Sequence, residues 1–541
     1  MSPVGPANPN GEDPQEDPAE EARRRQEEWE RRNEELKEEL GIYYVPLPPL
    51  DQPENPPVKV KGIFLTGHSI AFTERYERML KLIEETELNA VVIDIKDDRG
   101  RMSYRSEIEA VNELDAYYKP VPLPDIRATL DELHERGIYT IGRIVVFRDS
   151  EILPVQRPEW CIPLKDGGLY RDAGFAYGNP FNEELQDYNI AIAKEAALLG
   201  FNEIQFDYIR FPDKAAYMDQ VAYYPGRGDR SKSDAISGFI QKARQELAPY
   251  NVHVAYDVFG VIANSWGDSD DIGQVWEEFA AHSDYICPMI YPSHYYPVRQ
   301  GGSVVPYWFG LRFPDTNPSA TITGALSDAI KRNAAVENPA IIRPWLQAFT
   351  AKWLGNIYGA GSYITYGPSE IRAQIDAALA LGIDEYILWD ANNENYPRGA
   401  FYTAAESDRR TAALAAGRTA KGQDALGRTA RQAAEAYLEA FKERRWREAY
   451  ALQRIENMDG NRYQDWFNKA GGRLKEWKVS AAEQNGDTVQ VTVDLTVSAG
   501  GEEAKLTGEQ WPLVLENNVW RIRPSERFLK LIEGAALEEL G

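Results

Sequence analysis

The chain has 541 residues, 43% of them hydrophobic and 11% aromatic, so it is long enough for two or three folded units with substantial cores. Its formal net charge of -25 excludes nucleic acid and anionic membranes as expected partners, because their phosphates would be repelled, whereas a neutral ligand such as a glycan would not be. The two cysteines, Cys161 and Cys287, are too few for a disulfide framework, and no CxxC pattern indicates a zinc site.

Residues 1–58 have the composition of a charged, Pro-rich tether. The segment 20–40 places Glu and Arg at helical spacing with only a thin apolar stripe, which predicts a solvated helix or disorder, and a Pro-rich linker follows it. The start of the chain is no signal peptide, and no run approaches the roughly 18 apolar residues that cross a bilayer. We expect an extracytoplasmic or cell-surface protein held away from an anchoring surface by this tether, with a cytoplasmic location left open.

Residues 59–402 alternate short apolar runs with amphipathic segments. Several of the amphipathic segments, such as 182–200 and 367–382, end in Gly directly before the next apolar run, as helices do at their C-caps. The apolar runs are KGIFLTG (61–67), NAVVIDIK (89–96), YTIGRIVVF (139–147), NEIQFDYIRF (202–211), VHVAYDVFG (252–260), DYICPMIYP (284–292), AIIRPWLQAF (340–349) and DEYILWDAN (384–392).

Eight strand–helix alternations predict a (β/α)8 TIM barrel, of the α/β class, with some long loops. The rival is a doubly wound open sheet, which would carry a Gly-rich phosphate turn after the first strand; KGIFLTGHSIAF has none. After a linker at 403–426, residues 427–541 predict two helices and then antiparallel strands. This order resembles the NTF2-like cone fold, and we expect an α+β accessory domain there.

The active site of a TIM barrel lies at the carboxyl ends of its strands, so polar residues that point inward there are the candidates. In the fourth run, Ile204, Phe206 and Tyr208 form an apolar outer face, which leaves Gln205 and Asp207 pointing into the barrel.

The same alternation supplies two more inward carboxylates. In the fifth run Asp257 points inward, and in the second run Asp94 and Lys96 do. Burying like charges together costs several kcal/mol unless they are paired or share a proton, which is expected where one carboxyl is tuned to act as an acid.

An ion-pair network is the alternative reading of these aspartates, because Lys96, Arg143 or Arg210 could simply neutralise them. His68 and His294 follow the first and sixth strands and could line the cleft, or could be ordinary surface histidines.

GFNEIQFDYIRFP (200–212) resembles the fourth-strand signature of a bacterial family of TIM-barrel domains classed with the glycoside hydrolases. The resemblance extends through VVIDIKDDRG, AYDVFG, MIYPSHY and ILWD, and covers most of residues 60–400. More distantly, the chain resembles the chitinase-type barrels, whose Met-x-Tyr and floor Trp match Met289, Tyr291 and Trp389. The catalytic Glu of chitinases would fall at Ile209, so their substrate-assisted mechanism does not carry over.

The resulting hypothesis is glycoside hydrolysis by a carboxylate pair. Asp207 would be the nucleophile or the base toward water, and Asp257 the general acid. Whether hydrolysis retains or inverts the configuration at the anomeric carbon is left open. No metal or organic cofactor is implied. The residues expected to bind the substrate are Asp94, Lys96, Arg143, Gln205, Arg210, Tyr291, Gln347 and Trp389.

The expected substrate is a cell-wall or extracellular polysaccharide. Two other classes remain open: a non-catalytic glycan-binding barrel, and a structural protein of the cell envelope. The first predicts glycan binding that survives replacement of the aspartates, and the second predicts no glycan binding.

Overall fold

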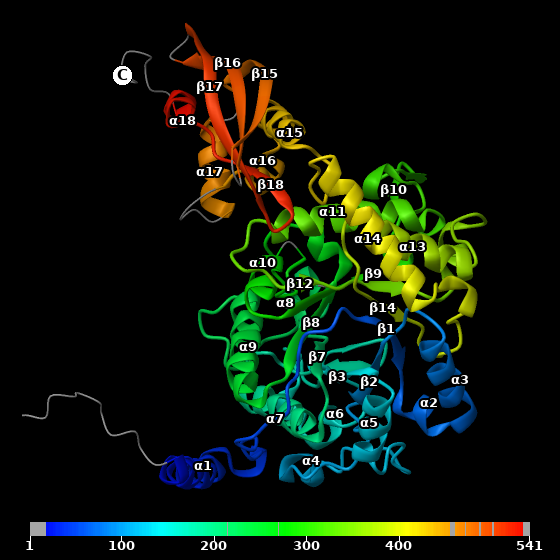
Figure 1. Cartoon of the computed structure of the whole chain (residues 1–541). Coiled ribbons are helices and arrows are strands. Elements are labelled where there is room, and N and C mark those ends of the chain that lie inside the picture. Colours follow the sequence, from blue (N-terminus) through cyan, green and yellow to red (C-terminus); the bar gives the residue numbers. More distant parts are fainter. Residues whose placement is uncertain are drawn as a thin grey trace, which may run out of the picture.

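The computed structural model describes residues 18–213, 215–268, 270–454, 460–470, 472–485, 488–499 and 502–533. Its centre is a closed parallel barrel of eight strand positions (Figure 1). β9 pairs with β8 on one side and with β13 on the other, which closes the ring and rules out the open sheet. The positions are β1 (Lys61–Leu65), β2 (Ala90–Lys96), β3 (Tyr139–Val145), β7 (Glu203–Asp207), β8 (His253–Phe259), β9 (Tyr285–Ile290), β12 with β13 (Ile341–Ile342, Trp345–Gln347) and β14 (Tyr386–Trp389).

Helices surround this barrel, and the predicted TIM-barrel fold is confirmed (Figure 1). Gly200 ends α7 in the left-handed conformation at φ 113°, directly before β7, as the sequence predicts. The outer helices are α3 (Thr73–Glu84), α5 (Ile126–Glu135), α7 (Glu183–Leu199), α9 (Lys232–Leu247), α10 (Trp276–Ala281), α11 (Pro318–Asn333), α13 (Pro368–Ala380) and α14 (Ala404–Ala420).

The two-residue alternation of the strands divides the core into an outer layer and a barrel interior. Phe206 of β7 packs on Phe239 of α9, with ring centroids 5.5 Å apart, and the Tyr256 hydroxyl donates to the carbonyl of Ile240 in the same helix. Both side chains therefore face outward. The interior holds Val60, Phe64, Ala90, Val92, Tyr139, Ile141, Ala255, Tyr285, Cys287, Tyr291, Trp345 and Ile387.

The floor of the barrel interior is charged. Arg343, fully buried, donates to Glu203 at 2.7 Å and to Glu385 at 2.9 Å, and its guanidinium lies 3.5 Å from the ring centre of Tyr285. A buried arginine is tolerated where carboxylates and an aromatic face replace its water, so this cluster closes the end of the barrel opposite the carboxyl ends of the strands.

Long connections at the carboxyl ends carry elements of their own. The β3–α7 connection forms a small sheet in the order β4-β6-β5, and the β9–α11 connection forms a hairpin. These elements are α2 (Gly67–Ala71), α4 (Glu109–Glu113), β4 (Arg148–Asp149), α6 (Leu153–Gln156), β5 (Arg171–Asp172), β6 (Phe175–Tyr177), α8 (Ala215–Val221), β10 (Val298–Gln300), β11 (Ser303–Val305) and α12 (Trp353–Tyr358).

The N-terminal segment forms a helix, and the stretch that follows the helix packs on the barrel. α1 (Pro18–Leu40) is followed by an extended stretch that runs along the base of the barrel. Asn55 donates to the carbonyls of Asn202 (2.8 Å) and Asn251 (2.9 Å), and the Tyr250 hydroxyl donates to the carbonyl of Pro46. The stretch expected to be a free linker is thus fastened to the loops that precede β7 and β8. None of the described helices is long and apolar enough to cross a membrane.

The segment expected to be a linker at 403–426 contains α14, which lies against the barrel: Ser407 accepts a hydrogen bond from Lys61, and Arg418 donates to the carbonyl of Ala380. Beyond it, the described residues form three helices, one more than the sequence predicts, and then an antiparallel sheet in the order β15-β16-β17-β18, so the predicted α+β character is present. The resemblance to the NTF2-like fold stays a prediction. The elements are α15 (Ala430–Lys442), α16 (Trp446–Leu452), α17 (Gly460–Ala470), β15 (Leu474–Asn485), β16 (Thr488–Ala499), β17 (Glu502–Glu516), β18 (Val519–Ile522) and α18 (Glu526–Glu533).

Candidate active site

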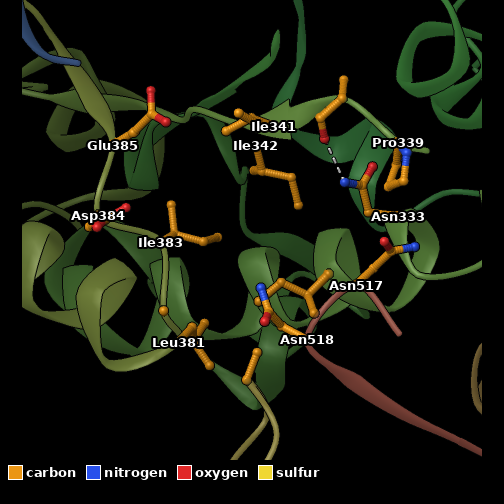
Figure 2. Close-up of a pocket in the computed structure, with 14 residues that line it drawn as sticks. Asn333, Pro339, Ile341, Ile342, Leu381, Ile383, Asp384, Glu385, Asn517 and Asn518 are labelled. Carbon is orange, nitrogen blue, oxygen red and sulfur yellow. Dashed lines mark hydrogen bonds between the residues drawn. The ribbon is translucent and has the colours of Figure 1, made fainter. Parts of the chain in front are cut away.

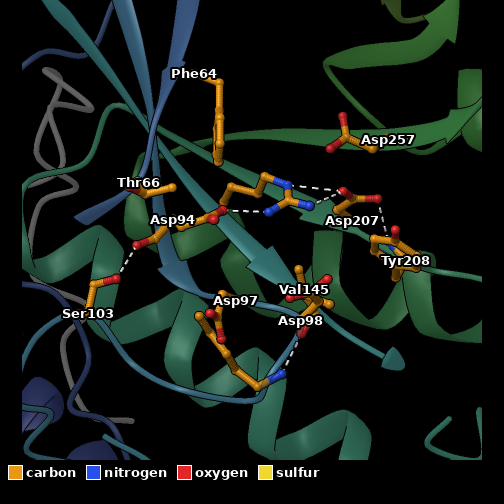
Figure 3. Close-up of polar contacts among 12 residues, drawn as sticks. Phe64, Thr66, Asp94, Asp97, Asp98, Ser103, Val145, Asp207, Tyr208 and Asp257 are labelled. Carbon is orange, nitrogen blue, oxygen red and sulfur yellow. Dashed lines mark hydrogen bonds and ion pairs between the residues drawn. The ribbon is translucent and has the colours of Figure 1, made fainter. Parts of the chain in front are cut away.

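Asp207 ends β7 at the carboxyl side of the barrel and points into it, as the alternation predicts (Figure 3). The Val146 amide donates to the Asp207 carbonyl at 2.9 Å, which holds the end of β7 beside the end of β3. Tyr208 then leaves the strand in the left-handed conformation, at φ 53°. The sequence predicted the Tyr208 ring on the outer face of the strand. That prediction is wrong, because the ring lies at the mouth of the barrel. That backbone conformation is costly for a residue with a side chain.

Arg143 of β3 bridges two of the predicted carboxylates. Its Nε donates to Oδ2 of Asp207 at 3.0 Å, Nη2 donates to the same oxygen, and Nη1 donates to Oδ1 of Asp94 (Figure 3). All three side chains are buried. Burial disfavours the charged guanidinium, but the carboxylates of Asp94 and Asp207 outweigh it and hold the Arg143 pKa well above its ordinary value. The bridge places a buried positive charge against the Asp207 carboxylate.

Asp94 and Asp257 are in environments that favour the protonated acid. Burial raises the Asp94 pKa to about 7, against the opposing charge of Arg143. Burial, followed by the negative charge of Asp207, raises the Asp257 pKa well above its ordinary value. Oδ1 of Asp257 accepts from the indole N–H of Trp345 at 2.7 Å, and its Oδ2 has no hydrogen-bond partner among the described residues. Burial and the charge of Asp207 therefore favour the protonated form of Asp257, and no described neighbour bonds to its Oδ2.

Aromatic rings flank these carboxylates. Trp389 is half-buried and stacks on Phe64 with ring centroids 4.2 Å apart, and the Arg143 guanidinium lies 5.3 Å from the Trp389 ring. Tyr291 is 6% exposed, and burial together with the charges of Asp257 and Asp207 raises its pKa well above its ordinary value. These contacts bring Trp389 and Tyr291 beside the aspartates, as the sequence predicts.

A second aromatic group continues outward from Tyr291. The Tyr291 ring meets those of His294 (5.2 Å between centroids) and Phe349 (5.7 Å), and Phe349 stacks on Trp353 at 5.8 Å and 23°. Trp353 is 37% exposed and His294 is also exposed. His68, the other predicted loop histidine, packs edge-on against Tyr118 instead.

Arg148 and Arg210 face the ring of Tyr208 at the mouth, with guanidinium carbons 4.7 and 5.2 Å from its centre. Arg148 also donates to the Tyr208 hydroxyl and lies 3.6 Å from Asp98. The sequence predicts Arg210 in the site, and it follows Asp207 by three residues, at the mouth of the barrel.

Three predicted substrate-binding residues lie deeper in the fold and are fully buried. Lys96 does not point into the barrel, because the register of β2 and β3 shifts between Asp94 and Lys96; its Nζ donates to Asn189 of α7 at 3.1 Å. Gln205 lies below Asp207 and donates to the Cys287 sulfur. Gln347 donates to Asp315 and to the carbonyl of Phe349, and accepts from the Ser293 amide. Both N–H groups of Gln347 are thus occupied in positioning loops.

Trp345, Tyr208 and Arg148 were not singled out in the sequence. Trp345 has the same inward parity as Gln347 on its strand, so the alternation could have found it. Arg148 lies beyond the end of β3, where the alternation gives no direction, and Tyr208 lies beyond the end of β7, where the outward direction predicted from the alternation is wrong.

The described residues hold no group of three or more His, Cys, Asp and Glu side chains placed to bind a metal ion. A cavity of about 220 Å³ lies at the other end of the strands, between the loops before β12 and β14 and the β17–β18 turn. Figure 2 shows Ile341, Ile383, Asp384, Asn517 and Asn518 around it. Neither the predicted aspartates nor the mouth aromatics line this cavity.

Residues 62–396 match the protein family described as "Putative glycosyl hydrolase domain". No curated protein matches the chain. Among solved structures, a hypothetical protein from Ruminiclostridium thermocellum is 36% identical, over 36% of this chain and 97% of its own, with a TM-score of 0.33. The PgaB (BpsB) glycoside hydrolase domain from Bordetella bronchiseptica is 14% identical, over 64% and 99%, with a TM-score of 0.41. An α-galactosidase from Thermus thermophilus is 13% identical, over 67% and 63%, with a TM-score of 0.38.

Proposed function

Because the chain belongs to this family of glycosyl hydrolase domains, and is thereby a glycoside hydrolase by class, we propose that Asp257 and Asp207 perform the hydrolysis as a pair. Asp257 acts as the general acid and Asp207 as the ionised partner. The observation that carries this proposal is the contrast between their environments: Arg143 donates twice to Asp207, whereas Asp257 is buried with one oxygen unused.

The two environments suit the two halves of the reaction. Cleavage of a glycosidic bond needs a proton on the departing oxygen and negative charge near the anomeric carbon. The unused Oδ2 of Asp257 supplies the proton. The Asp207 carboxylate supplies the charge, either by attacking the anomeric carbon or by activating a water, while Arg143 holds it in place. Asp94, on the other side of Arg143, orients the guanidinium and is positioned to bind a sugar hydroxyl.

The aromatic side chains at the mouth support a sugar as the ligand. Trp389 is half-buried beside Arg143. The stacked pair Phe349 and Trp353 lies further out, past Tyr291. Aromatic faces pack on the C–H faces of pyranose rings. A row of rings from inside the barrel to its surface fits a polysaccharide that binds through several sugar units.

Asp207 and Asp257 are 3% and 1% exposed, so a substrate reaches them only when side chains at the mouth shift. Tyr208 and Tyr291 are the aromatic groups beside them. Closure of this kind excludes water and strengthens the electrostatic effect of Arg143 on the bound substrate.

We propose a cell-wall or extracellular polysaccharide as the substrate, and an extracytoplasmic site of action. The observation that supports this is the charged, exposed helix α1 ahead of the docked stretch, whose composition suits a spacer between the catalytic domain and a surface.

A screen of bacterial cell-wall polymers and exopolysaccharides for new reducing ends tests the proposal. The wild-type chain should release product from at least one polymer, Asp207→Asn should not, and Asp131→Asn, on the exposed side of α5, should behave as wild type. Binding without product in the wild type, with affinity unchanged in Asp207→Asn, would identify a non-catalytic glycan-binding barrel instead.

A further inference from the structure

Arg210 is a buried cation for which the described residues supply no carboxylate partner. It is 6% exposed, and the one hydrogen bond that it makes to them goes from Nη1 to the carbonyl of Phe211, at 2.9 Å. Among the residues that the structure describes, no ion pair joins it to an Asp or Glu. The other buried arginines of the barrel differ: Arg143, Arg332 and Arg343 each pair with at least one carboxylate.

Three aromatic rings surround the Arg210 guanidinium, at centroid distances of 4.2 Å (Phe259), 5.2 Å (Tyr208) and 5.8 Å (Tyr177). Cation–π contacts offset only part of the desolvation cost of a buried charge that has no carboxylate partner. The rings hold the guanidinium in place and leave most of its donors unused. A guanidinium held in this way can donate to an anionic group of a ligand.

Arg210 contacts one aromatic ring close in the chain to each proposed catalytic aspartate. Phe259 is two residues beyond Asp257 on β8, so both side chains face the same side and Phe259 is nearer the mouth. Tyr208, the second ring on Arg210, directly follows Asp207. A group held by Arg210 would therefore sit on the sugar that occupies the cleavage site, or on its neighbour.

A second observation supports an anionic ligand here. The guanidinium of Arg148 also contacts the Tyr208 ring, 4.7 Å from its centre. The Arg148 Nε is buried with no hydrogen-bond partner in the described part of the chain. Among the described residues, the one ion pair that either of these two guanidiniums makes is between Arg148 and Asp98, at 3.6 Å.

We propose that Arg210 binds an anionic substituent of the glycan, a carboxylate or a sulfate ester, and that the substrate is an acidic polysaccharide. This inference rests on the proposed function. The net charge of -25 opposes attraction over long distances, but it is screened within about 10 Å, so a desolvated guanidinium acts only on a bound sugar. Acid recognition should therefore appear in affinity, not in the association rate.

The test compares oligosaccharides of glucuronate and galacturonate with the same molecules after reduction of their carboxyl groups to primary alcohols. A sulfated oligosaccharide and its desulfated form make a second pair. Dissociation constants are measured by calorimetry on the full chain carrying Asp257→Asn, which prevents turnover. Within the preferred pair, the acidic member should bind at least about tenfold more tightly. Which pair shows this preference identifies the anion as carboxylate or sulfate.

Arg210→Met, which keeps the aliphatic stem, should abolish the preference, and Arg210→Lys should keep part of it. Arg127→Met is the matched control, since Arg127 is exposed on α5 and its side chain also donates to a backbone carbonyl, that of Leu198. If the melting curve shows that Arg210→Met does not fold, Arg210→Lys serves as the test. Lysine cannot bind an anion in a bidentate way, so the preference for the acidic oligosaccharide should be reduced in that variant.

Equal binding of acidic and neutral members, or a preference that survives loss of Arg210, would overturn the inference. If the wild-type chain cleaves only neutral polymers, the glycoside hydrolase proposal stands and the acidic substrate falls. If it neither binds nor cleaves any glycan of either kind, both fall.

Discussion

The indole N–H of Trp345 donates to Oδ1 of Asp257 at 2.7 Å, and both side chains are at most 1% exposed inside the barrel. This bond fixes which carboxyl oxygen is occupied and leaves Oδ2 for the proton. It also favours the ionised carboxylate, and so it opposes the effect of burial on the Asp257 pKa. Trp345 is thus a positioning residue that both orients and tunes the proposed acid.

Trp345→Phe should move the alkaline limb of the pH–rate profile to higher pH. Without the indole donor the Asp257 pKa rises further, the acid keeps its proton to higher pH, and proton donation becomes slower, lowering kcat by roughly tenfold. Trp160→Phe is the matched control, because Trp160 is equally buried and donates to a different carboxylate, that of Glu184. An alkaline limb that stays in place in Trp345→Phe would show that the bond does not tune the acid.

The pKa of Asp94, raised by burial to about 7, predicts a pH-dependent stability. Its value in the unfolded chain is about 3.9, so the folded chain binds this proton more tightly. The stabilisation is complete below about pH 4 and is lost as the pH rises to about 7. The unfolding free energy of wild type minus that of Asp94→Asn should therefore fall across this window, by up to about 1.4 kcal/mol per pH unit. Denaturant titrations at several pH values measure it, and a constant difference would contradict it.

The alternation of inward and outward residues could be predicted from the sequence where strands are regular. It placed Asp207, Asp257 and Asp94 in the barrel, because period two is fixed by strand geometry. It failed at Lys96, where the register of β2 against β3 shifts, and at Tyr208, where a left-handed residue ends β7. Both errors lie at strand ends, where the regular ladder stops.

The partners of the charged side chains could not be predicted. Lys96, Arg143 and Arg210 were equal candidates to neutralise the aspartates, and only Arg143 does so. Its strand adjoins both β2 and β7, which is a property of the closed barrel rather than of sequence spacing.

The charged floor of the barrel should be essential for stability. Arg343→Met leaves Glu203 and Glu385 buried without their partner, which should lower the free energy of unfolding by about 3–5 kcal/mol. Arg136→Met is the control: Arg136 also pairs with two carboxylates, Glu84 and Glu132, but on the surface, so its loss should cost no more than about 1 kcal/mol. Equal losses in urea unfolding would show that the floor is not a stabilising cluster.

The docked N-terminal stretch predicts a difference between two truncations. Removing residues 1–58 takes away the hydrogen bonds of Asn55 and Pro46 to the base of the barrel and should lower the melting temperature by several degrees. Removing residues 1–40 leaves these bonds and should cost less. Identical melting temperatures for both truncations and the full chain would mean that the stretch contributes nothing to stability.

The central claim is that Asp207 and Asp257 serve one transition state. On any polymer that the wild-type chain cleaves, kcat for Asp207→Asn and for Asp257→Asn is the measurement that tests it most directly. Each should fall by about 10²–10⁴-fold with the fold retained, and the double variant should be hardly worse than either single one, because residues that act as a unit are strongly non-additive. Near-wild-type turnover in either single variant would remove that aspartate from the mechanism and contradict the account.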